Sequence, residues 1–322
     1  TLVRGAGLTL PQRPEVLDWA RGLDAPGPYA PVPRPAPRPP QAHRPRKMAV
    51  TRIETLTRDP YAVWARDILR FYPLDRPDEP VDARARGTAI HRAFEQFVLA
   101  HPRALPPDSA AIFEELYVQA LVDQGMPQEA LARERALARE AAEWVADLEA
   151  RRRADGRVIH VERSGALDVD LAGGRFTVTA KADRIEVDPA GRGHILDYKT
   201  GKAPSKNMVE AGFSPQLTLT AAILAAGGFA DIGKSEPAEL TYLEVTGRRP
   251  AGKEVTPVDE KDTVQAASDA LEGMKALIDR FDDPDQPYMS RTAPQFVKAR
   301  VSDYDHLARV FEWSTAGEEG EE

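Results

Sequence analysis

A dense run of prolines near the amino end most limits what this chain folds into. Nine of the 22 residues from 26 to 47 (PGPYAPVPRPAPRPPQAHRPRK) are proline. Because proline lacks a backbone N–H and has a fixed φ, such a run forms neither a helix nor a central strand. The sequence therefore predicts an extended linker here. We interpret residues 1–25 as the remnant of an upstream domain and expect the folded unit to start near Met48.

The apolar pattern after Met48 predicts a mixed α/β domain. Helical spacing occurs before and after a block of strand-like segments, which are separated by the turns Gly173-Gly174 and PAGRG. Ser214 and Pro215 suit the N-cap and first position of the helix that they begin. The predicted architecture is a mixed central sheet flanked by helices. The expected helices cover residues 50–71 (as two short pieces), 87–100, 108–153, 214–226 and 263–281, and the expected strands cover residues 158–171, 175–188, 194–198 and 238–247.

Composition excludes several kinds of site. The 322 residues contain no cysteine, which rules out disulfides, thiolate zinc sites, cysteine nucleophiles and cysteine-ligated iron–sulfur clusters. Any metal must therefore be bound by oxygen and imidazole ligands. The sequence has no run of 18 apolar residues and no recognisable secretory leader, so we expect a cytoplasmic protein that is not inserted in a membrane.

Charge gives a weaker indication about partners. The net charge of −8 argues weakly against a nucleic-acid partner, but electrostatic footprints are local. Two basic stretches, within residues 34–52 and 133–153, are either such a footprint or ordinary solvated surface. The acidic end, residues 316–322, is expected to be a disordered tail.

The strongest chemical signal lies in ILDYKTGK, residues 195–202. On a strand, alternate side chains share a face, so Asp197 and Lys199 point the same way. If the PAGRG turn pairs this strand with the preceding one, Asp183 lies beside Asp197, and two adjacent carboxylates repel unless a cation lies between them. Carboxylates, carbonyls and waters suit Mg²⁺ or Mn²⁺, and Mn²⁺ tolerates an added imidazole better.

The Lys199 side chain has two alternative roles. Beside a dication it would orient or deprotonate a water, or stabilise charge that develops on a phosphate. The alternative is a salt bridge across the strand without a catalytic role. The same spacing in Asp259-Glu260-Lys261 has no strand pattern around it, so it serves as an internal control.

Three further residues bear on that site, and each has a structural alternative. His91 in GTAIHRAFEQF borders an apolar helix face and is either a ligand or a satisfied core residue. Glu162 in HVERSG, on the strand before Asp183, is either a supporting acid of the site or a solvent-facing charge. Gln216 lies in the first turn of the helix after the Asp-x-Lys strand, where it either meets a phosphate or is merely exposed.

A phosphate-loop pattern also occurs, GFADIGKS at residues 228–235. That motif requires a strand before it and a helix after it, so that backbone amides cradle the phosphates. Here an alanine-rich helix precedes the pattern and a strand-like segment follows it. We therefore do not interpret these residues as an ATP site.

The ordered set of motifs resembles the RecB-type nuclease branch of the PD-(D/E)xK superfamily. The set spans residues 87–216 and consists of GxxxH (Gly87 to His91), the Glu162 strand, ADRIE around Asp183, LDYKTGK around Asp197 and Lys199, and PQL around Gln216. The segments TRIETLTRDPYAVWARDIL and SDYDHLARVFEW are similar to the carboxy-terminal nuclease domain of AddB-type subunits, which belong to the AddAB helicase–nucleases. The likeness covers residues 48–315.

The resemblance implies a restriction-endonuclease-like core with additional amino- and carboxy-terminal helices, preceded by a helicase-like domain. It implies a DNA exonuclease that processes double-strand breaks for recombinational repair. Single-stranded DNA would be fed to it by a motor, with an AddA-like helicase–nuclease subunit as partner. By the same resemblance, Mg²⁺ or Mn²⁺ would be held by His91, Asp183, Asp197 and the backbone carbonyl of Tyr198. Lys199 would assist the attacking water, and Gln216 would help to place the DNA strand or Lys199.

Two departures from the family pattern stand out. Many AddB-type nucleases carry four cysteines that hold an iron–sulfur cluster, whereas this chain has none. Apolar packing around Tyr61, Trp64 and Trp313 is therefore expected to replace the cluster. The family also often has tyrosine four residues after the glutamine, and here that position is Thr220, which argues against a stacking role there.

Two rival functions share these motifs. A catalytically silent nuclease-like scaffold or DNA-binding domain is disfavoured, because a silent copy has no physical reason to keep facing carboxylates beside a lysine. Another nuclease of the same superfamily, such as a CRISPR adaptation nuclease or a restriction enzyme, is distinguished only by the proline-rich segment and by the carboxy-terminal resemblance.

Overall fold

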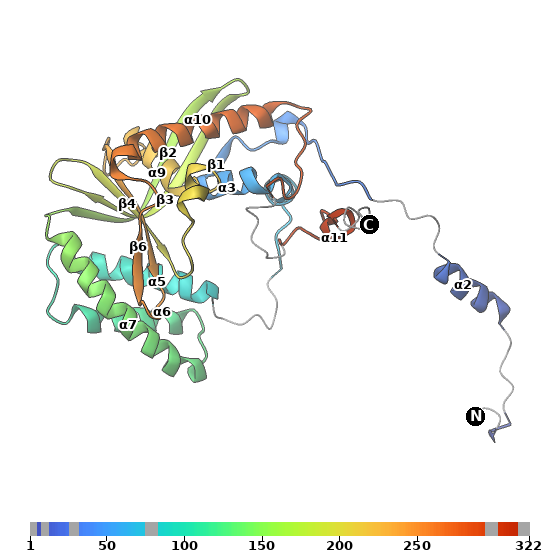
Figure 1. Ribbon diagram of the computed structural model, residues 1–322, viewed down its shortest axis with the longest axis horizontal. Coiled ribbons are helices and arrows are strands. Elements are labelled where there is room, and N and C mark those ends of the chain that lie inside the picture. Colours follow the sequence, from blue (N-terminus) through green and yellow to red (C-terminus); the bar gives the residue numbers. More distant parts are fainter. Residues whose placement is uncertain (1–4, 8–12, 26–31, 75–82, 294–301, 315–322) are drawn as a thin grey trace. The chain divides into compact units, whose positions relative to one another are not determined.

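The computed structural model describes residues 5–7, 13–25, 32–74, 83–293 and 302–314 (Figure 1). The chain divides into two compact units. The larger unit runs from Ala36 to Tyr304 and contains the sheet, and the smaller one combines Thr1–Pro35 with Asp305–Glu322. The acidic end at 316–322 lies outside the described residues.

The larger unit is built on one mixed sheet. Three of its strands form the predicted antiparallel meander β2–β3–β4, β5 is parallel to β4, and β6 pairs antiparallel with β5. β1 runs parallel to β3. The α/β architecture expected from the sequence is therefore confirmed, while β1 and β6 are too short to show a strand period in the sequence. The strands are β1 (Lys47–Ala49), β2 (Val158–Leu171), β3 (Gly174–Val187), β4 (Gly193–Lys199), β5 (Pro237–Val245) and β6 (Gly252–Val255).

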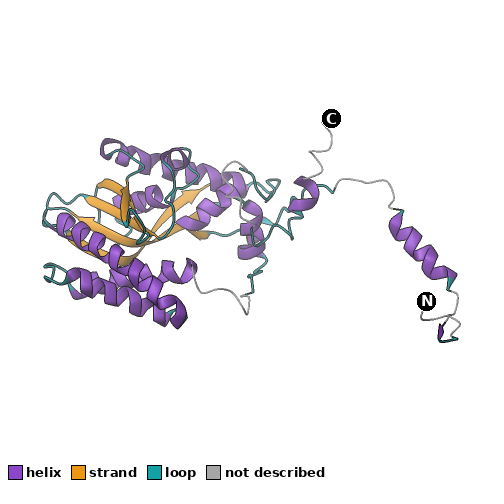
Figure 2. Cartoon of the chain, turned by 60° about the horizontal axis from the view of Figure 1, so that its bottom comes forward, coloured by secondary structure: helices purple, strands orange, loops and turns teal. Residues whose placement is uncertain are grey.

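Helices cover both faces of the sheet (Figures 1 and 2). On one face lie α3 (Val50–Arg58), α9 (Gln216–Ala225) and α10 (Thr263–Asp282), and on the other lie α5 (Ala83–Ala100), α6 (Ser109–Asp123) and α7 (Gln128–Arg153). β4 contributes to both cores, because Ile195 packs with the α9 group while Leu196 and Tyr198 pack with the α5 group. α9 is apolar all round, which suits a helix that lies between strands and α10.

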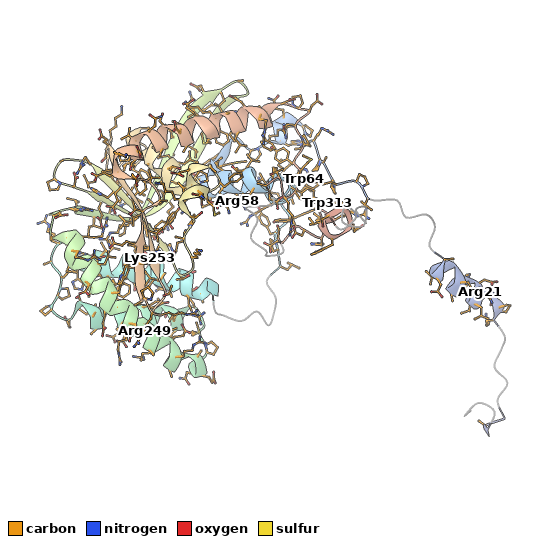
Figure 3. All side chains as sticks on the ribbon, in the orientation of Figure 1. Arg21, Arg58, Trp64, Arg249, Lys253 and Trp313 are labelled. Atoms are coloured by element: carbon orange, nitrogen blue, oxygen red, sulfur yellow. The ribbon has the colours of Figure 1, made fainter. Side chains whose placement is uncertain are left out.

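Short helical segments lead into the site-bearing elements. α4 (Pro60–Val63) continues into a π-helical turn at Trp64–Ile68, and α8 (Lys206–Glu210) precedes α9. Arg58, labelled in Figure 3, donates from Nε to the carbonyl of Phe213 at 2.7 Å and thereby ties α3 to the loop before α9. α9 begins one residue later than predicted, with Pro215 as its N-cap, because the Ser214 hydroxyl instead donates to Glu54 Oε2 at 3.3 Å.

The proline-rich stretch is partly built into the larger unit. Arg44 is buried, and its guanidinium donates to four backbone carbonyls, three of which lie at and just beyond the carboxy end of α10. The last carbonyls of a helix have no partner within the helix, and a guanidinium offers five donors for them. The compact unit therefore starts at Ala36 rather than near Met48. Residues 26–31 of the stretch lie outside the described residues.

Much of the two basic stretches is occupied by contacts within the fold. Arg46 lies 2.5 Å from a carboxylate oxygen of Asp282, in addition to the buried Arg44. In the second stretch Arg151 pairs with Glu254 at 2.9 Å. These arginines therefore pair with groups of the fold, although Arg151 remains 60% exposed.

A buried ion cluster links α7 to the sheet. The guanidinium of Arg184 on β3 is fully buried and binds Glu149 of α7 and Glu186 of β3, the latter at 2.7 Å. Arg152 of α7 binds Glu186 at 3.0 Å and Glu239 of β5 at 2.9 Å. Burial alone raises the pKa of Glu149 and Glu186, but Arg184 and the other arginines outweigh it and lower both pKa values. We call this set the α7 ion cluster.

The smaller unit contains two of the described helices. Its helices are α2 (Pro14–Asp24), which has no buried residue, and α11 (Val310–Ser314). The rings of Tyr61 and Trp64 contact each other with centroids 4.9 Å apart. Trp313 belongs to the smaller unit, where the Arg34 guanidinium lies 4.8 Å from the centroid of its ring. Every helix among the described residues is too short or too polar to cross a membrane.

Candidate active site

The site lies where β3 and β4 separate. The antiparallel ladder between them ends at the pair Arg184 and Leu196, so the next two residues in register are Asp183 and Asp197. β1 pairs with β3 only at residues 177–179, which leaves Asp183 between the two ladders. The two carboxylates thus lie beside each other at a break in the sheet, as the turn spacing predicts.

Asp197 is buried and is held by two side chains. Its Oδ2 lies 2.5 Å from Lys199 Nζ, and its Oδ1 accepts a hydrogen bond from Gln216 Nε2. Burial and the nearby Asp183 outweigh the attraction of Lys199 and raise the pKa of Asp197 to about 7. Gln216 also accepts from Lys199 Nζ, at 3.4 Å. The first turn of α9 therefore fixes both members of the Asp-x-Lys motif.

His91 reaches the same place from α5. Its Nδ1 lies 3.3 Å from Asp183 Oδ1, and its Nε2 lies 3.2 Å from the backbone carbonyl of Tyr198. Burial alone lowers the pKa of His91, but Asp183 and the other carboxylates outweigh it, so the pKa is raised overall. The imidazole is thus in contact with two of the groups expected to be metal ligands.

Tyr198 is positioned by α5 as well. Its N–H donates to Asp183 Oδ2 at 3.0 Å, and its ring stacks on Phe94 with centroids 3.9 Å apart and planes 9° apart. The ring of His91 meets it edge-on, with centroids 5.5 Å apart. Phe94 follows His91 by three residues, so the two share one side of α5. Phe94 supports the site through Tyr198, a role that its place in the apolar helix pattern does not reveal.

Glu162 lies opposite Asp183 on β2. Its neighbours Val161 and Arg163 pair with Arg184 and Ala182, yet Glu162 itself has a φ of 53°, in the left-handed region. That conformation is uncommon for residues other than glycine. Glu162 Oε2 also lies 2.5 Å from Lys181 Nζ. Glu162 thus brings a second carboxylate within 4.8 Å of a ligand atom of Asp183.

Three of these residues form a donor set suited to a metal ion. One ligand atom each from His91, Glu162 and Asp183 lies within 4.8 Å of the others, and all three side chains are partly exposed. A site with one imidazole and two carboxylates suits Mn²⁺ well, and Mg²⁺ can also bind to it. Asp197 is not part of this set, and its carboxylate contacts Lys199 and Gln216. The structure therefore adds Glu162 to the residues that the sequence places at the metal.

The comparison with protein families bears directly on this arrangement. Residues 47–293 match the model of the PD-(D/E)XK nuclease superfamily, more than half of the chain and every residue of the site described above. The chain belongs to the PD-(D/E)XK nuclease superfamily. Nucleases of this superfamily use divalent metal ions, in agreement with the donor set around Asp183.

The nuclease domain also has relatives of similar sequence. An uncharacterized protein of Rickettsia bellii is 29% identical over 193 residues, and one of Rickettsia typhi is 30% identical over 191 residues. Each match covers 58% of this chain and 22% of the relative, so the chain spans about a fifth of the length of these relatives. The solved structure described as "Crystal structure of SSO0001" aligns with a TM-score of 0.30 and 13% identity, covering 71% of this chain and 77% of that one.

Two further motifs lie outside the site of the nuclease domain: the Asp-x-Lys at residues 259–261 and the phosphate-loop pattern at residues 228–235. Asp259 precedes a short 3₁₀ turn at Glu260–Asp262, which includes Lys261, rather than lying on a strand. The phosphate-loop pattern at residues 228–235 follows α9 and precedes β5. It therefore has a helix before it and a strand after it, the reverse of what phosphate binding requires.

Glu162 is expected to contribute to metal affinity. Glu162→Gln removes one carboxylate from the donor set and is expected to weaken Mn²⁺ binding about tenfold or more, as measured by calorimetric titration. Lys181→Met is expected to strengthen binding, because Lys181 competes with the metal for Glu162 Oε2. An affinity of Glu162→Gln equal to that of the wild type would exclude Glu162 from the metal shell.

Proposed function

We propose that this chain is a Mg²⁺- or Mn²⁺-dependent deoxyribonuclease that cuts the phosphodiester bonds of single-stranded DNA. One observation carries the proposal: Asp183 and Asp197 directly follow the last ladder pair of β3 and β4, close enough to repel each other, with Lys199 and Gln216 bound to Asp197. Such a carboxylate pair destabilises the fold unless it serves a cation. A salt bridge without catalytic function would not need the second carboxylate.

Each side chain of the site has a distinct proposed role. A bound Mg²⁺ or Mn²⁺ would polarise the scissile phosphate and lower the pKa of a water. His91, Glu162 and Asp183 would hold the ion, and Asp197 and the Tyr198 carbonyl would be further ligands. Lys199 would orient the attacking water or stabilise charge on the phosphate, since its ammonium is partly exposed beside Asp197. Gln216 keeps Lys199 and Asp197 in place.

We further propose that the domain is the nuclease module of an AddB-like subunit. In that role it would act as an exonuclease on strands delivered by an AddA-like helicase–nuclease partner, during double-strand break repair by recombination. The order of the five motifs over residues 87–216 supports this proposal, as does the likeness of the segments TRIETLTRDPYAVWARDIL and SDYDHLARVFEW. The matched relatives are much longer than this chain, which is compatible with a module of a larger protein.

Cleavage of end-labelled single-stranded DNA tests the activity. The wild-type chain is expected to cut with Mg²⁺ or Mn²⁺ and not with EDTA, and Asp197→Ala is expected to lower the rate by about 10²-fold or more. Asp170→Ala is a matched control, because Asp170 is an exposed carboxylate on β2. The same assay on the complex with an AddA-like subunit shows whether the motor is required. Metal-dependent cleavage by Asp197→Ala at the wild-type rate would contradict the proposal.

A further inference from the structure

An open groove lies on the α10 side of the larger unit. It has a volume of about 550 Å³ and is bounded by α3, by the segment from α8 to Pro215, and by α10. Its wall is mainly apolar and includes Ile53, Val209, Leu219 and Met274. Gly273 of α10 also lines it, and a Cβ added there would meet no described atom within 4 Å. We call this cavity the α10 groove.

The rim of the α10 groove is acidic. Among the described residues, four carboxylates and one ammonium line it, which gives an excess of three negative charges. The ammonium of Lys206 is already shared between Glu210, at 3.7 Å, and Asp259, at 3.6 Å. Asp262 and Asp269 are exposed, and Asp269 accepts a neutral hydrogen bond from Gln265. Uncompensated negative charge therefore surrounds an apolar floor.

We propose that the α10 groove docks a segment of a partner protein that carries apolar side chains flanked by lysine or arginine. Apolar side chains would leave water for the floor, and the flanking cations would meet the acidic rim. The volume lies within the range of about 300–1,000 Å³ that is typical of small-ligand pockets, so the groove has room for a few side chains. The same rim repels a phosphate backbone, so the groove does not extend the path of a DNA strand. Charge complementarity thus selects a basic, apolar peptide.

The groove and the nuclease site are separate enough to be tested separately. The shared element is the segment from α8 to Pro215, which forms one wall of the groove and leads to Gln216. Among the described residues, none that binds Asp183 or Asp197 lines the groove. Loss of docking would therefore leave the proposed nuclease chemistry in place, and the reverse also holds.

The test measures the binding of two labelled peptides to the full chain by fluorescence anisotropy. The probe is KLFKRLFKR, which presents leucine and phenylalanine between cations, and its counterpart ELFEELFEE carries the opposite charge. Gly273→Trp fills the groove and is expected to weaken binding of the basic peptide by about tenfold or more, a loss readily resolved in a titration. The double variant Asp262→Lys and Asp269→Lys is expected to weaken it by about the same factor.

Matched controls separate the groove from the general negative charge of the chain. Gly273→Ala leaves the groove open, and the double variant Asp155→Lys and Asp170→Lys reverses two exposed acids that do not line it. Both controls are expected to bind the basic peptide as the wild type does. If Gly273→Trp does not fold, the charge-reversal pair decides the outcome. Absent binding, equal binding of the acidic peptide, or equal losses in the control and groove variants would each overturn the proposal.

Discussion

Replacing Lys199 with alanine is expected to lower metal-dependent cleavage of single-stranded DNA by about 10²–10⁴-fold, the usual contribution of a positioned acid–base group. The ammonium lies 2.5 Å from Asp197 Oδ2 and is fixed further by Gln216 at 3.4 Å. It is also 30% exposed, so a phosphate or a water at the carboxylate pair can reach it. The measurement is the single-turnover rate at saturating Mn²⁺, which separates the chemical step from product release.

Two further protein variants serve as a control and as a test of how Lys199 acts. Lys261→Ala removes the lysine of the control motif Asp259-Glu260-Lys261, which lies on a 3₁₀ turn, and is expected to leave the rate unchanged. Lys199→Arg keeps the charge, but a guanidinium cannot release its proton near neutral pH. Partial rescue by Lys199→Arg would indicate that Lys199 stabilises charge, and no rescue would indicate proton transfer. A wild-type rate in Lys199→Ala would refute the role assigned to this residue.

Replacing Arg184 with leucine is expected to lower the free energy of unfolding by about 3–5 kcal/mol, the range found when one partner of a buried ion pair is removed. The substitution would leave the carboxylates of Glu149 and Glu186 buried without their nearest cation. Arg152 also reaches Glu186, at 3.0 Å, so part of the α7 ion cluster would persist. Urea denaturation followed by circular dichroism measures the change.

Arg163→Leu provides the matched comparison. Arg163 lies on the neighbouring strand β2, but its side chain is 42% exposed and its pair with Asp231, at 3.2 Å, faces solvent. Exposed pairs contribute at most about 1 kcal/mol, so this variant is expected to remain close to the wild type. Equal losses in the two variants would show that the burial of the α7 ion cluster has no special weight in stability.

The part of the fold that follows from local rules was predictable. The long strands β2 and β3, joined at Gly173-Gly174, alternate in burial, and the PAGRG turn sets the register that brings Asp183 beside Asp197. The approximate start of α9 follows from Ser214 and Pro215, although Pro215 rather than Ser214 is its N-cap. These features depend on neighbours in the chain, which is why the sequence contains them.

The remaining features depend on contacts between distant segments. The left-handed backbone of Glu162 and the stacking of Phe94 on Tyr198 leave no trace in residue type or spacing. Arg44 looked like one more charge in a proline-rich linker, and only the folded chain shows it bound to the end of α10. Propensity describes a segment by itself, whereas these contacts are decided by which segments meet.

The dependence of the site on α5 has a mechanical consequence. His91 contacts Asp183, and Phe94 stacks on Tyr198. The single helix α5 therefore positions both the proposed metal ligand His91 and Tyr198 of β4. A shift of α5 along its axis by the rise of one residue, about 1.5 Å, would move the His91 imidazole away from Asp183 and separate the Phe94 ring from Tyr198. The two contacts would be lost or gained together, so a shift of α5 caused by binding at its far end would change the geometry of the whole site.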